Sequence, residues 1–210
     1  DPGTIPTNTG QDRVDYLRGD SSNEGTNGQQ WRVRTSSLGD FVNSSAVYVR
    51  RPSATEIPYA DQSTFNSYVT AVASRTPVVY AGSNDGMLHV FNASDASDDG
   101  TSTAAKTADS GKEMLAYVPA AVYPNLKNLT TPNYIHNYFV DNTPVIADAQ
   151  LSSAACTPSS DATKCWRTVI TGGLGGGGQG IYALNGTDPS TFSTASAASL
   201  VLWEFTDQDD

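Results

Sequence analysis

The sequence predicts an all-β fold built from short antiparallel strands, and three observations support this prediction. Only 16% of the 210 residues are charged, whereas glycine, proline, serine, threonine and asparagine are frequent, which favours short strands and turns. A turn followed by a strand begins at Asn43, and a similar pattern begins 98 positions later at Asp141. Each copy continues into three further candidate strands. Repeated four-stranded antiparallel units form the blades of a β-propeller, so we expect a partial β-propeller of two four-stranded antiparallel blades with short helical insertions.

The four strands of each copy follow one another in the same order. In both copies the second strand ends in glycine, and a glycine-containing turn leads into the third strand. Ser83-Asn84-Asp85-Gly86 is the clearest turn, because Asp-Gly supplies the positive φ angles that a tight hairpin needs. The expected strands lie at residues 46–49, 78–82, 87–92 and 113–117 in the first copy, and at 145–147, 168–172, 181–185 and 201–205 in the second.

Insertions explain why the repeat is longer than an ordinary blade. Residues 50–76 separate the first two strands, and apolar residues from Phe65 to Val72 have the spacing of an amphipathic helix. A Ser- and Asp-rich stretch separates the third and fourth strands, and residues 119–129 predict a short helix between the copies. The expected divisions are an N-terminal segment that docks on the propeller (1–40), blade one (41–118), an inter-blade helical connection (119–137) and blade two (138–210).

Two blades are too few to close a ring. Closed propellers contain at least about four blades, and an open pair leaves an apolar sheet face in water. We therefore expect the chain to be a fragment of a larger propeller, or to have a partner that covers this face. Because long loops on a rigid scaffold often carry recognition, we expect contacts at the insertions 59–74 and 94–110.

Charge and hydropathy exclude several classes of partner. The net charge of −10 provides no basic surface for nucleic acid or anionic lipid, so we expect neither as a partner. No apolar run approaches the roughly 18 residues of a membrane span, which predicts that the chain does not insert into a membrane. The first residues do not resemble a signal peptide, and any export signal is expected outside this sequence.

The chain contains two cysteines, Cys156 and Cys165, on either side of a turn-like stretch. This arrangement predicts a disulfide and therefore an oxidising compartment. The alternative is a pair of thiols in a cytosolic loop. No further thiol is present from which a metal site might be built.

Few residues suggest chemistry. Asp95, Ser97 and Asp99 have the spacing of oxygen ligands in a calcium loop, but Lys106 stands where such a loop needs a bidentate glutamate, and a solvated loop is the alternative. The glycine run at 173–178 matches the sequence motif of a dinucleotide-binding site. That motif requires a helix after it, whereas a strand is expected here. The two imidazoles, His89 and His136, have no ligand or nucleophile spacing around them. The sequence therefore predicts no catalytic and no cofactor-binding residue.

Several separate blocks resemble the N-terminal part of the β-propeller domain of the PilC/PilY family, whose members are type IV pilus biogenesis factors and tip adhesins. The resemblance extends over residues 12–207. The blocks are Arg13 to Asp20, Trp31 to Arg34, Leu38 to Ser45, Val79 to Ala93, Tyr138 to Pro144, Thr171 to Leu184 and Trp203 to Asp207.

This resemblance implies a non-catalytic protein at the pilus tip or on the bacterial outer surface, which it reaches through the periplasm. It implies that the protein promotes pilus assembly, counters retraction and mediates adhesion. The implied partners are pilins or minor pilins and a receptor on a host cell or another surface. It implies no cofactor within this segment; members of the family carry a calcium loop beyond the block that ends here at Asp207, so the resemblance allows for calcium in the parent protein.

Arg18-Gly19-Asp20 is the tripeptide that integrins recognise in other proteins, and it is linked with host adhesion in the family that this chain resembles. A purely structural interpretation competes with this one. The preceding residues predict a helical turn that ends at Gly19 in a left-handed cap, and Tyr16 and Leu17 have the character of docking residues.

Two further functions remain as alternatives. The stretch from Val79 to Phe91 is also similar to the blade repeat of pyrroloquinoline-quinone dehydrogenases. Those enzymes commonly have adjacent cysteines near the quinone, whereas Cys156 and Cys165 are not adjacent. The other alternative is a propeller that acts as a scaffold in outer-membrane assembly.

Overall fold

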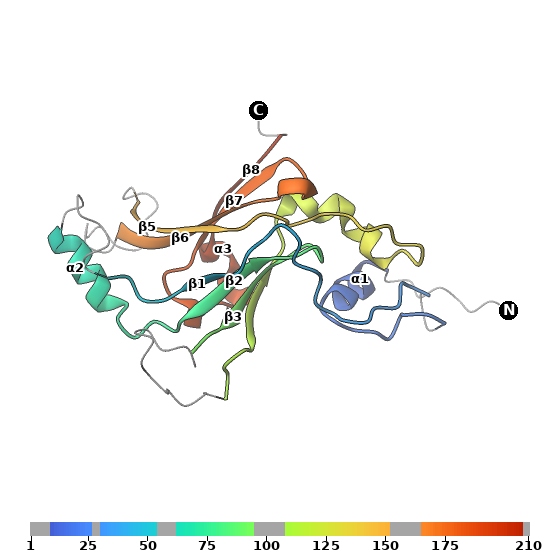
Figure 1. Cartoon of the computed structure of the whole chain (residues 1–210), viewed down its shortest axis with the longest axis horizontal. Helices are drawn as coiled ribbons and strands as arrows, with labels where there is room; N and C mark the ends of the chain where they lie inside the picture. Colours follow the sequence, from blue (N-terminus) through green and yellow to red (C-terminus); the bar gives the residue numbers. More distant parts are fainter. Residues whose placement is uncertain (1–8, 27–29, 54–61, 95–107, 152–164, 208–210) are drawn as a thin grey trace.

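The computed structural model describes residues 9–26, 30–53, 62–94, 108–151 and 165–207. In this part of the chain, two four-stranded antiparallel sheets have their strands in chain order (Figure 1). This arrangement confirms the prediction of two propeller blades. The first sheet contains β1 (Val47–Val49), β2 (Val78–Gly82), β3 (Leu88–Asn92) and β4 (Glu113–Tyr117). The second contains β5 (Val145–Gln150), β6 (Trp166–Gly173), β7 (Gly180–Asn185) and β8 (Val201–Thr206).

Strand register defines which residues of the two sheets are equivalent. Val78 pairs with Asn92 in the first sheet, and Val169 pairs with Asn185 in the second. Matching the two asparagines makes Gly82 equivalent to Gly173. The strands expected at 78–82 and 168–172 make Gly172 the equivalent of Gly82, which is wrong by one residue. The difference matters because successive residues of a strand lie on opposite faces of the sheet.

An irregularity repeats at equivalent positions and supports this alignment. The pairing of β3 with β4 shifts between Val90 and Phe91, and the pairing of β7 with β8 shifts between Ala183 and Leu184. A bulge at the same place in both sheets bends the fourth strands alike. The two sheets are therefore copies of one structural unit.

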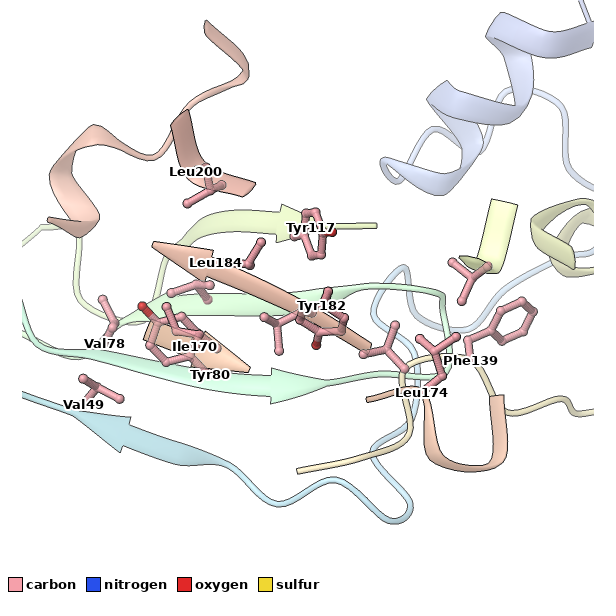
Figure 2. Packing of buried hydrophobic residues seen from close by; sticks show 14 of the residues in the cluster. Val49, Val78, Tyr80, Tyr117, Phe139, Ile170, Leu174, Tyr182, Leu184 and Leu200 are labelled. Carbon is pink, nitrogen blue, oxygen red and sulfur yellow. The ribbon is translucent and has the colours of Figure 1, made fainter. Parts of the chain in front are cut away.

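The two sheets pack against each other through opposite faces. Tyr80 and Leu88 of the first sheet lie in one apolar cluster with Ile170, Tyr182 and Leu184 of the second (Figure 2). The residue equivalent to Leu88 is Ile181, which lies on the other face of the second sheet, because it neighbours the buried Tyr182 along β7. Packing of one face on the opposite face of the next unit is the arrangement of propeller blades.

Helices lie at the two ends of this pair of sheets (Figure 1). The predicted amphipathic helix is α2 (Gln62–Ala71), and its Phe65 and Tyr68 are buried against Trp166 of β6. The insertion of the first sheet therefore packs on the second sheet. The helix predicted between the copies is the 3-10 helix η1 (Ala120–Thr130).

The remaining helices are short, apart from α1. The helix α1 (Thr9–Leu17) lies beside η1, because the hydroxyl of Tyr16 donates to the carbonyl oxygen of Leu129 at 3.2 Å. The other short helices are η4 (Gly175–Gly177), η5 (Pro189–Thr191), η6 (Thr194–Ser196) and α3 (Ala197–Leu200). Within the described ranges, none of the helices has the length and hydropathy of a membrane span.

Candidate interaction surface

The outer face of the second sheet carries a patch of exposed apolar side chains. Val145, Ile181, Trp203 and Phe205 come from three of its four strands and are all more than one-third exposed. Thr171 pairs with Val145 and with Ala183, which in turn pairs with Trp203. Phe205 lies opposite Ile181 in the same pair of strands. We call these four residues the open face.

In the first sheet, the residues equivalent to the open face are buried. Leu88 and Tyr117 are 0% and 9% exposed, because the second sheet packs on them. Their equivalents Ile181 and Phe205 are 50% and 45% exposed. The open face is therefore the repeat of a buried sheet-to-sheet interface, and exposed apolar patches of this kind mark contact surfaces.

A charged cluster lies on the outer face of the first sheet. The imidazole of His89 is 3% exposed, with Nδ1 at 2.5 Å from Glu113 Oε1 and Nε2 at 3.0 Å from Asp85 Oδ2. Both ring nitrogens therefore face a carboxylate, which favours the doubly protonated ring. Burial by itself lowers the pKa of His89, but the hydrogen bonds and charges of Asp85 and Glu113 outweigh burial and raise it above its usual value.

Asp85 also ties the hairpin turn to the N-terminal segment. Its Oδ2 accepts a hydrogen bond from the backbone nitrogen of Gly39 at 2.8 Å, and its Oδ1 accepts one from that of Met87 at 3.2 Å. A side chain at position 39 would collide with the backbone of residue 85. The cluster therefore connects residue 39, the β2–β3 turn and β4.

The sequence predicts His89 as a strand residue and shows no ligand or nucleophile spacing around it. The contact between His89 and Asp85 could have been predicted from the sequence, because the tight turn brings positions 85 and 89 together. Glu113 is distant in sequence and becomes a partner only because β3 pairs with β4.

The Arg18-Gly19-Asp20 tripeptide forms the end of α1. Gly19 has a φ of 108°, and its backbone nitrogen donates to the carbonyl oxygen of Tyr16 at 2.9 Å. The backbone nitrogen of Asp20 donates to the carbonyl oxygen of Asp15 at 2.9 Å, which completes a Schellman cap. This is the helix end that the sequence indicated. All three residues are exposed, and adhesion through the tripeptide stays a prediction.

The side chain of Arg34, which lies after α1 in the N-terminal segment, stabilises this helix end. Its guanidinium donates to the carbonyl oxygens of Tyr16 and Asp20 and forms an ion pair with Glu24 at 2.7 Å. Asp20 accepts a hydrogen bond from the backbone nitrogen of Ser22, which is the main cause that lowers the pKa of this exposed carboxyl. The tripeptide is therefore held in one conformation.

Some predicted sites lie outside the described residues. Asp95, Ser97 and Asp99 of the proposed calcium loop fall in the range 95–107, and Cys156 falls in 152–164. Cys165 is buried at the start of β6, and its disulfide with Cys156 stays a prediction. In the described part of the chain, no group of three or more His, Cys, Asp or Glu residues is arranged to hold a metal ion.

Comparison with known proteins identifies the family. The profile of the PilY1 β-propeller domain matches residues 38–210. The chain belongs to the PilY1 β-propeller family. This confirms the resemblance found in the sequence, and the two sheets of this PilY1-family chain are part of a β-propeller.

Curated PilY1 proteins are similar over nearly the whole chain. A "Type IV pilus biogenesis factor PilY1 homolog" of Xylella fastidiosa is 36% identical over 200 residues, which are 94% of this chain and 14% of the relative. The "Type IV pilus biogenesis factor PilY1" of Pseudomonas aeruginosa strain PAK is 34% identical over 210 residues, covering 97% of this chain and 15% of the relative. The chain thus spans about one-seventh of the length of these relatives.

A solved structure is also similar in part. The crystal structure of the Pseudomonas aeruginosa PilY1 C-terminal domain is 28% identical, with a TM-score of 0.45. The match covers 73% of this chain and 24% of that structure.

Proposed function

We propose that this chain is a non-catalytic part of a type IV pilus biogenesis factor, and that it promotes pilus assembly and adhesion through binding by its propeller. The observation that carries the proposal is the pair of propeller sheets, which match the PilY1 β-propeller domain and whose curated relatives are named as pilus biogenesis factors. The partners would be pilins or minor pilins and a receptor on a host cell or another surface. The protein would act outside the cell, at the pilus tip or on the outer surface.

The packing supports binding rather than turnover as the role of this segment. The buried charged cluster at His89 joins backbone segments to each other, and the apolar side of α2 is used against Trp166. The open face is equivalent to the side of the first sheet that packs on the second sheet. We propose that a further sheet of the same protein covers it, so that these residues build the scaffold that presents binding loops.

The role in piliation is tested by deleting the gene of the full protein in a piliated bacterium and complementing it with variants. We expect deletion to remove surface pili, and the unaltered gene to restore them. Phe205→Asp places a charge on the open face and should abolish restoration, whereas Phe205→Leu should preserve it. Tyr123→Asp is the matched control, because Tyr123 is 58% exposed on η1 and outside the open face.

The outcomes separate the proposal from its alternatives. Unchanged piliation after deletion would contradict the proposal and favour a scaffold in outer-membrane assembly. Dye-linked oxidation of an alcohol after addition of pyrroloquinoline quinone would instead favour a quinoprotein dehydrogenase. Immunoblots of each variant establish whether a loss of pili follows from loss of the protein.

A further inference from the structure

A cavity of about 260 Å³ lies between the N-terminal segment, the β2–β3 turn and the end of η1. Its lining includes Tyr16, Arg32, Asn84, Leu129 and Tyr134. The hydroxyl of Tyr16 donates to the carbonyl oxygens of Arg32 and Leu129 at 3.1 and 3.2 Å, so two walls are fixed to each other. Aromatic walls with a few polar groups are typical of small-ligand sites.

In the described part of the chain, each charged side chain that lines this cavity lies beside a partner, with one exception. Arg34 pairs with Glu24 at 2.7 Å, Asp40 with His136 at 2.8 Å, and Asp85 with His89 at 3.0 Å. Within the ranges that the structure describes, Arg32 is the charged residue of the lining that has no ion-pair partner. Its charge is therefore available to a ligand.

Arg32 is held in position for such a contact. Its backbone nitrogen donates to the carbonyl oxygen of Thr130 at 3.0 Å, and its guanidinium carbon lies 4.0 Å from the centre of the Tyr134 ring. The hydroxyl of Tyr134 in turn accepts a hydrogen bond from the backbone nitrogen of Asn137 at 3.1 Å. Because an aromatic ring covers the face of a guanidinium, the N–H donors in its plane remain available for a planar carboxylate.

Asn84 lines the same cavity and is fixed by its side-chain oxygen. The residue is 3% exposed, and its Oδ1 accepts a hydrogen bond from the backbone nitrogen of Phe139 at 3.1 Å. Its Nδ2 is buried and has no acceptor in the described part of the chain.

We propose that this cavity binds a small ligand with one carboxylate, which forms an ion pair with Arg32. A single carboxylate is specified because Arg32 is the one charged side chain of the described lining without an ion-pair partner. The carboxylate belongs to an acidic sugar or to an acidic amino acid, which share this chemistry. The inference does not depend on the role in pilus biogenesis.

The test is a ligand-observed NMR titration of the full chain with two probes, glucuronate and N-acetylaspartate amide. We expect saturable binding of at least one probe. The probe that binds more tightly shows whether the ligand is an acidic sugar or an acidic amino acid. The uncharged analogues glucuronamide and N-acetylasparagine amide should bind at least about tenfold more weakly, because they lose the ion pair. Equal binding of charged and uncharged analogues, or no saturable binding of either acid, would overturn the proposal.

Variants of the protein locate the site. Arg32→Gln should weaken the preferred acid by about tenfold or more, and Arg32→Lys should retain part of the affinity. Lys112→Gln is the control. It removes an exposed charge just before β4, at the end of the first sheet opposite the β2–β3 turn, and should leave binding unchanged. Undiminished binding by Arg32→Gln would overturn the assignment. The comparison of charged with uncharged analogues on the unaltered chain keeps the test valid if Arg32→Gln fails to fold.

Discussion

Asn43 and Asp141 are equivalent residues of the two sheets, 98 positions apart, and they hydrogen-bond directly to each other. The backbone nitrogen of Asn43 lies 3.1 Å from Asp141 Oδ1, and its side-chain nitrogen lies 2.6 Å from Oδ2. The carboxylate is 2% exposed. Two residues farther on, the nitrogen of Ser45 donates to Thr143 Oγ1 at 2.8 Å, again between equivalent positions. The turn before each first strand therefore joins one repeat unit to the next.

This contact predicts strong coupling between the two residues. Asp141→Ala should lower the free energy of unfolding by about 1–3 kcal/mol, because it removes the charged acceptor of two hydrogen bonds from Asn43. Asn43→Ala should cost less, because the backbone donor remains. A double-mutant cycle from urea unfolding should give an interaction energy above about 0.5 kcal/mol. Additive effects of the two substitutions would show that the contact contributes nothing specific.

Equivalent positions on the two sheets should respond differently to truncation. Leu88→Ala removes a fully buried side chain and should cost about 2–5 kcal/mol, whereas Ile181→Ala on the open face should cost less than about 1 kcal/mol. Thermal or urea unfolding of this chain measures both values. A similar loss at the two positions would mean that the open face is already covered. In the full protein we expect the cost of Ile181→Ala to rise.

The turn after β6 should not accept a side chain at position 177. A Cβ atom on Gly177 would overlap the carbonyl oxygen of Phe139, and a backbone group moves aside less readily than the end of a flexible side chain. We expect Gly177→Ala to destabilise the chain by about 3 kcal/mol. Gly10→Ala is the matched control, because nothing lies within 4 Å of its Cβ position in α1, and it should be neutral or slightly stabilising. Equal melting temperatures for both variants would contradict this account.

Stability should decrease as the pH rises through the pKa of His89. Because the folded state raises this pKa, the charged ring contributes fully below its ordinary value of about 6.5, and the contribution is lost at higher pH. Urea unfolding between weakly acidic and alkaline pH should show this decline, and His89→Gln should flatten it. His136→Gln is the control, since the pair of His136 with Asp40 is exposed. A His89 ring that titrates below its ordinary pKa by NMR would refute the prediction.

The sequence by itself determined the local elements. Residue spacing identified the strands, the Asp85-Gly86 hairpin and the helix that becomes α2, because periodicity and turn residues act over a few neighbouring positions. The repeat and the family blocks also predicted the partial propeller and the family. The end of α1 at Gly19 followed from the same local rules.

Tertiary structure decided which side of each strand is buried and which distant residues meet. The sequence pattern makes Gly172 the equivalent of Gly82, whereas the hydrogen-bonded register gives Gly173, and a shift of one residue exchanges the two faces of a strand. The pairing of His89 with Glu113 and the cavity beside Arg32 likewise join segments that are far apart in the chain. Such contacts depend on how sheets and loops pack, and packing is a property of the whole fold that no short stretch of sequence encodes.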